Sequence, residues 1–134
     1  MRPPRLLVAW AWTALIFVLC WTPRAFVPGE HGASRPFPIP YFDKFVHFAL
    51  FAGFSFWWMV AGTLRARWVV ALGLLAALAS ELGQLAPAVN RDANWPDGLA
   101  DSLGLLAGLV AYRWASRRFP AFAPPGPGAV DRLA

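Results

Sequence analysis

A few ionisable and amide side chains interrupt an otherwise apolar chain, and any chemistry of this protein must use them. They occur in three groups along the sequence: Asp43, Lys44 and His47; Glu81 and Gln84; and Arg91, Asp97 and Asp101. An ionisable group inside a membrane segment is energetically costly and usually persists because it is paired or has a function. These eight positions are therefore the candidate functional residues.

The residue types allow two kinds of catalysis. His47 and Glu81 would form a general acid–base pair, because imidazole exchanges protons near neutral pH. Imidazole with Asp and Glu oxygens would also suit a divalent ion such as Zn²⁺ or Mn²⁺. No second histidine lies at a metal-binding spacing, so neither a metal ion nor another cofactor is predicted. Ser80 and Ser102 lack the context of a catalytic serine, which argues against a covalent mechanism.

Recognition is the third kind of chemistry. Lys44 and Arg91, beside an acidic and amide-lined pocket, would hold an anionic or peptide-bearing lipid headgroup. Ordinary structural roles compete with this hypothesis: Asp43 would cap a helix, Lys44 would extend to lipid headgroups, and His47 would be a hydrogen-bonded packing residue. Glu81 is harder to explain in this way, because a carboxylate inside an apolar helix needs a partner or a proton.

Composition places these residues in a membrane protein. Of 134 residues, 58% are hydrophobic and only 14% are charged, whereas soluble domains have about 25% charged residues. The mean hydropathy is +0.48. The net charge is +5, but the arginines flank apolar segments and form no basic stripe, so no nucleic-acid partner is expected. The single cysteine, Cys20, excludes an intrachain disulfide.

Four apolar stretches predict an all-α bundle of four transmembrane helices. Their bounds are about 6–22, 45–64, 68–85 and 97–115, and together they form one domain over residues 1–119. Residues 120–134 are rich in Pro, Ala and Gly and are predicted to be a disordered tail. Basic residues favour two cytoplasmic termini, because seven flank one side of the predicted spans and four flank the other. The predicted location is the bacterial inner membrane.

This topology brings the polar groups to the same side. At a rise of 1.5 Å per residue, His47 and Asp101 lie about 6 Å along the helix axis from the starts of their predicted helices, and Glu81 lies about 9 Å from Pro87 at the end of its helix. The three side chains are therefore expected at similar depths in the membrane. Asp97, Asp101, Gly104 and Gly108 follow one helical stripe at steps of four, three and four. The glycine pair permits close approach of a neighbouring helix, which would turn both aspartates into the bundle.

The polar motifs resemble those of the VanZ-like family, named for a teicoplanin-resistance membrane protein. Asp43-Lys44-x-x-His47-Phe48 resembles the first family signature. Glu81-x-x-Gln84, then Arg91, then Asp97-x-x-x-Asp101-x-x-Gly104-x-x-x-Gly108 resembles the second. The resemblance implies a small helical membrane protein of bacteria, with no established biochemical activity, whose founding member is linked to low-level glycopeptide resistance. This chain has Asp101 where many members have asparagine.

The sequence thus predicts a multi-pass protein with an outward-facing polar pocket. Its expected partners are membrane lipids and a lipid-linked cell-wall component related to peptidoglycan, with a link to the glycopeptide antibiotic response. One alternative is a small membrane hydrolase or transferase that uses His47 and Glu81 as an acid–base or metal site. Another is a structural protein in which the polar residues bind helices together.

Overall fold

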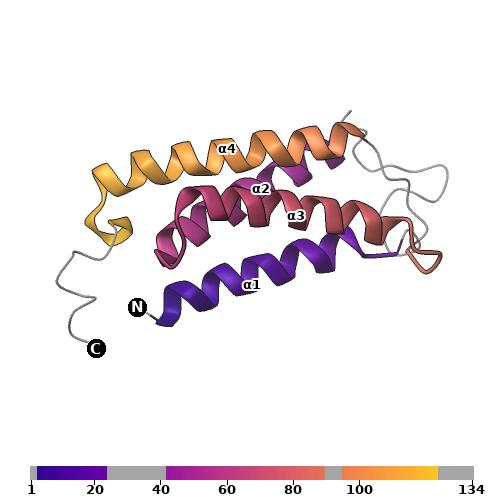
Figure 1. Cartoon of the computed structure of the whole chain (residues 1–134), viewed down its shortest axis with the longest axis horizontal. Coiled ribbons are helices and arrows are strands. Elements are labelled where there is room, and N and C mark those ends of the chain that lie inside the picture. The colour runs from indigo at the N-terminus through magenta and orange to yellow at the C-terminus, as the bar shows by residue number, and fades with distance from the viewer. Residues whose placement is uncertain (1–2, 24–41, 90–94, 124–134) are drawn as a thin grey trace.

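The computed structural model describes residues 3–23, 42–89 and 95–123, and these residues are helical with short connections. Four α-helices run alternately in opposite directions in a single bundle (Figure 1). They are α1 (Pro3–Cys20), α2 (Phe42–Ala61), α3 (Ala66–Gln84) and α4 (Trp95–Arg118), followed by the 3₁₀ helix η2 (Pro120–Phe122). The all-α prediction is confirmed: the described part of the chain has no strand.

The helix ends differ from the predicted bounds by a few residues. α2 begins at Phe42, and Asp43 in its first turn complements the positive end of the helix dipole. Asp43 is thus inside the helix, not the cap that precedes it. α4 begins at Trp95 and accommodates Pro96, because a first turn does not use the missing N–H. α4 continues to Arg118, where basic side chains favour the helix C-terminus.

The connection between α2 and α3 is a tight turn that glycine makes possible. Gly62 has a φ of 69°, a conformation that L side chains rarely adopt. Its backbone N–H is 3.1 Å from the carbonyl oxygen of Met59 and 3.3 Å from that of Trp58, which ends α2. This short turn keeps α2 and α3 antiparallel neighbours, so the start of α2 and the end of α3 lie at the same end of the bundle (Figure 1).

α2 and α4 form the most extensive helix pair. Their backbones approach closely at the predicted glycine stripe: a Cβ added at Gly104 would overlap the carbonyl oxygen of Phe48, and one at Gly108 that of Ala52. Because these neighbours are backbone atoms, they cannot move aside as a flexible side chain would. The two glycines therefore set the distance between α2 and α4.

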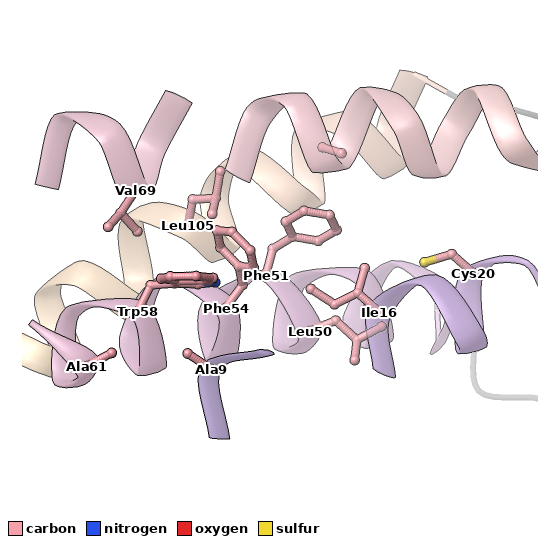
Figure 2. Packing of buried hydrophobic residues seen from close by; sticks show 11 residues of the cluster. Ala9, Ile16, Cys20, Leu50, Phe51, Phe54, Trp58, Ala61, Val69 and Leu105 are labelled. Carbon is pink, nitrogen blue, oxygen red and sulfur yellow. The ribbon is translucent and has the colours of Figure 1, made fainter. Parts of the chain in front are cut away.

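The apolar core lies mainly between α1 and α2 (Figure 2). Its labelled members from these helices are Ala9, Ile16, Cys20, Leu50, Phe51, Phe54, Trp58 and Ala61, with Val69 from α3 and Leu105 from α4. Two tryptophan N–H groups also link α1 to α2: Trp12 donates to the carbonyl oxygen of Leu50 at 2.8 Å, and Trp58 to Thr13 Oγ1 at 3.0 Å. These contacts hold α1 against α2.

Residues 120–122, which the sequence assigned to a disordered tail, form η2. Arg5 donates to the carbonyl oxygens of Ala121 and Ala123, and the Phe122 ring lies 5.5 Å from that of Phe56. An arginine near the start of α1 and an aromatic ring on α2 thus hold this segment. Residues 124–134 of the predicted tail lie outside the described residues.

Two helices of the described chain, α2 and α3, are long and apolar enough to cross a membrane, while α1 is apolar but shorter. This finding rests on length and composition and covers two of the four predicted spans. Only 22% of the apolar 18-residue segment of α3 is buried inside the bundle, compared with 44% of the corresponding segment of α2. Most of the apolar surface of α3 therefore faces outward.

Candidate functional site

The start of α2, the end of α3 and the start of α4 lie at one end of the bundle (Figure 1). This end carries the candidate residues, and we call the described ones the polar end: Asp43, Lys44, His47, Glu81, Gln84, Asp97 and Asp101. One potential ligand atom from each of His47, Glu81 and Asp101 lies within 4.8 Å of the other two. Three helices therefore contribute to one cluster. Arg91 lies outside the described residues.

His47 and Asp101 form a buried pair at the centre of the polar end. His47 Nδ1 is 2.9 Å from Asp101 Oδ1, and the two residues are 4% and 0% exposed. A neutral imidazole that donates from Nδ1 has Nε2 as its acceptor, so the aspartate selects the tautomer and the ring orientation. The pair links α2 to α4 and presents Nε2 as the second functional atom of the imidazole.

Lys44 forms a second link between α2 and α4. Its Nζ is 2.6 Å from Asp43 Oδ2 and 2.5 Å from Asp97 Oδ1. The Lys44 side chain is 21% exposed and that of Asp97 is 8% exposed, so this ion pair is better shielded from solvent than an ordinary surface pair. The lysine is engaged by two carboxylates, which weakens the prediction that it holds an anionic headgroup.

α3 supplies the remaining polar groups. Gln84 is 1% exposed, and its Nε2 has no hydrogen-bond partner among the described residues. The same is true of Oδ2 of Asp101, the second oxygen of the carboxylate that pairs with His47. A buried polar atom without a partner costs about 1–3 kcal/mol. These two atoms therefore have unused hydrogen-bonding or ligating capacity close to the cluster.

The serine hydroxyls have structural partners. Ser80 donates to the carbonyl oxygen of Ala77 and Ser102 to that of Gly98, both at 2.8 Å within their own helices. Ser55, which sequence reasoning missed, donates to the carbonyl oxygen of Leu105 at 2.8 Å and joins α2 to α4. The spacing along the helix could have identified Ser55, because it lies about two turns after His47 on the side of α2 that faces α4.

Comparisons with protein-family models, curated proteins and solved structures found no match. The fold and the site define a helical protein with a largely apolar surface and a buried polar end. The VanZ-like resemblance stays a prediction, supported by the spacing of the polar motifs.

Proposed function

We propose that the chain is a four-span inner-membrane protein of the VanZ-like type, with both termini in the cytoplasm. Its polar end faces outward and binds the phosphate-bearing headgroup of a cell-envelope lipid or a lipid-linked peptidoglycan component. The observation that carries this proposal is the buried Nε2 of Gln84, an amide donor without a partner among the described residues, beside the His47–Asp101 pair. The membrane and the headgroup are supported by separate observations.

The exposure pattern of α4 supports a membrane location for this helix, although length and composition alone do not mark it as a membrane span. One stripe of α4 is apolar and exposed, at steps of three or four residues: Leu99, Leu103, Leu106, Val110 and Trp114. The buried face carries Asp97, Asp101, Gly104 and Gly108. An apolar exterior around a polar interior suits lipid, since soluble monomers rarely expose such continuous apolar patches. α1 exposes Leu7, Trp10 and Val18 in the same way.

The length of α1 is also compatible with a span. Its 18 residues correspond to about 27 Å of helix at 1.5 Å per residue. The hydrocarbon core of a bilayer is about 30 Å thick, and a short helix is accommodated by local thinning or by flanking side chains that reach the interface. α1 and α4 therefore complete a four-span bundle with α2 and α3.

Labelling at the two ends of the bundle tests the orientation. Ala88 follows α3 at the polar end and Thr63 lies in the turn at the opposite end, and both are exposed. In intact cells, a membrane-impermeant maleimide should label Ala88→Cys, while Thr63→Cys should react only after permeabilisation. The native Cys20 is buried, and the unsubstituted chain measures its background. Labelling of Ala88→Cys only after permeabilisation would overturn the outward-facing site.

Headgroup binding predicts a specific effect at Gln84. Gln84→Leu removes the buried donor with little change in volume, and the affinity for a short-chain phosphatidic acid should fall at least about tenfold, as expected for a hydrogen bond to a charged group. The measurement is isothermal titration of the purified chain in detergent, with divalent cations present. The matched ligand is the diacylglycerol of the same chains, which lacks phosphate.

Ser102→Ala is the matched variant for this titration, because the Ser102 hydroxyl donates its hydrogen bond to the carbonyl oxygen of Gly98 within its own helix. It should bind phosphatidic acid as the unsubstituted chain does. Unchanged binding by Gln84→Leu, or equal binding of the diacylglycerol, contradicts the proposal. A fall in the folded fraction of Gln84→Leu that accounts for all lost binding would instead support a structural role.

A second candidate function is a hydrolase or transferase, and the His47–Asp101 geometry favours it. A carboxylate that orients an imidazole is the usual support of a general base, and Glu81 lies within reach as a second carboxyl group. Turnover of a lipid phosphate ester by the purified chain, lost in His47→Gln, would establish this function in place of simple binding.

The structural alternative also has support, because three polar links among the described residues join α2 to α4: Lys44–Asp97, His47–Asp101 and Ser55–Leu105. It does not account for α3, whose Gln84 directs a buried amide nitrogen to no described partner. The polar residues of α2 and α4 therefore have a packing role. Gln84 on α3 is the residue whose substitution distinguishes a binding site from simple interhelical packing.

A further inference from the structure

Carboxylates outnumber cationic side chains among the described residues of the polar end. Lys44 is paired with Asp43 and Asp97, which leaves one negative charge in excess in that group. The neighbouring cluster of His47, Glu81 and Asp101 has two carboxylates and one imidazole. Carboxylate oxygens and an imidazole nitrogen are ligands for a divalent cation, whereas a phosphate by itself is held by hydrogen-bond donors and positive charge. The donor set of this cluster therefore suits a divalent cation better than a phosphate alone.

The cluster has the dimensions of a metal site. In a site with metal–ligand bonds of about 2.1 Å, neighbouring ligands are about 3.0 Å apart in an octahedral arrangement and about 3.4 Å apart in a tetrahedral one. His47 Nδ1 and Asp101 Oδ1 are 2.9 Å apart, which already fits. All three ligand atoms lie within 4.8 Å. Glu81 can close the remaining distance by a small rotation of its flexible side chain, or bind through a water molecule.

Two atoms outside these contacts support the same assignment. Oδ2 of the fully buried Asp101 and Nε2 of the nearly fully buried Gln84 have no hydrogen-bond partner in the described residues. Oδ2 makes a second ligand oxygen available if Asp101 binds in bidentate fashion. The Gln84 amide lies one turn from Glu81 and can donate to a ligating carboxylate or to a metal-bound water, as outer-shell groups do in metal sites.

We therefore propose that His47, Glu81 and Asp101 bind one divalent transition-metal ion, Mn²⁺ or Zn²⁺, and that this ion receives the phosphate of the headgroup. One imidazole with two carboxylates suits these ions, whereas Mg²⁺ and Ca²⁺ prefer oxygen ligands throughout. On binding, the Nδ1 proton of His47 is released to solvent while Nε2 takes one up from solvent, so the imidazole stays neutral and Nδ1 becomes free to ligate the ion. The ion site stands on its own geometry, and only its role in receiving phosphate rests on the proposed function.

The test uses the full chain, purified in detergent and stripped with a chelator. Titration with Zn²⁺ and with Mn²⁺ in the absence of lipid should show one ion bound per chain, with Mg²⁺ much weaker. Glu81→Gln and Asp101→Asn keep the side-chain shape but remove a carboxylate, and each should weaken binding at least about tenfold. His31→Ala removes the other histidine, which lies outside the described residues, and should bind as the unsubstituted chain does.

Several results would overturn the metal site. They are the absence of a bound ion in the unsubstituted chain, unchanged affinity in folded Glu81→Gln, and loss of binding in His31→Ala. X-ray absorption of the Zn²⁺-loaded chain gives a readout that needs no variant: one imidazole with oxygen ligands supports the proposal, and two imidazoles refute it. Helicity and gel filtration establish whether each variant is folded.

A final titration separates this inference from the proposed function. Short-chain phosphatidic acid should bind the Mn²⁺-loaded chain and lose at least about tenfold in affinity after chelation, because an ion that contacts the phosphate contributes its charge directly. If the ion binds but phosphatidic acid does not bind in either state, the metal site stands and the headgroup function fails. If phosphatidic acid binds equally well in both states, the headgroup function stands and the ion's role fails.

Discussion

Asp101→Leu is expected to lower the free energy of unfolding by about 3 kcal/mol, because it leaves a buried imidazole without its partner. Asp101 is fully buried and pairs with His47, which is itself 4% exposed. Asp101→Asn should be far less damaging, since its amide oxygen can still accept from Nδ1–H. The measurement is unfolding of the purified chain in mixed micelles, followed by circular dichroism.

The double variant His47→Leu/Asp101→Leu makes this prediction specific. Replacing both members of a buried polar pair by apolar residues removes the unpaired group, so the double variant should be more stable than Asp101→Leu alone. Additive destabilisation would show that the two side chains are not coupled and would contradict the observed pair. Comparison with Asp101→Asn separates packing from metal binding, because that variant should stay folded while its metal affinity falls.

Gly108→Ala is expected to destabilise the bundle by about 1–3 kcal/mol, the usual cost of overpacking a close contact. The added Cβ would overlap the Ala52 carbonyl oxygen and Ser55 Oγ, so α2 and α4 must separate to admit it. That separation would also weaken the Ser55–Leu105 hydrogen bond at the same level of the interface. The same unfolding measurement applies.

Gly98→Ala is the matched control on the same helix, because a Cβ at Gly98 would meet no heavy atom within 4 Å. It should be neutral or stabilise the chain by up to about 1 kcal/mol, since alanine favours a helix over glycine. Opposite signs for the two substitutions are thus expected. Equal effects would mean that Gly108 contributes helix propensity alone and does not set the distance between α2 and α4.

The two variants at the α2–α4 interface and the Gln84→Leu titration address different parts of the polar end. α2 and α4 form a scaffold held by backbone contact at Gly104 and Gly108 and by polar links. α3 brings Glu81 and Gln84 to that scaffold. Substitutions in the scaffold should lower stability, and Gln84→Leu should alter binding without doing so. This difference is the sharpest experimental distinction between a functional site and interhelical packing.

The sequence by itself determined the helices and the end of the bundle at which the polar residues gather. The four apolar runs are local signals, and alternation of four helices then places the start of α2 and the end of α3 together. Spacing also placed Asp101 and Gly108 on one face of α4. Helical periodicity suffices for these predictions because it concerns one element at a time.

Only the tertiary structure decided which polar atoms meet. The rotation and separation of α2 and α4 determine three contacts between them. These are the Lys44–Asp97 ion pair, the contact of His47 Nδ1 with Asp101, and the hydrogen bond from Ser55 to Leu105. Backbone contact at the glycine stripe sets these quantities, and no pattern within a single helix contains them. The ordered η2 likewise depends on Arg5, which is more than one hundred residues away along the chain.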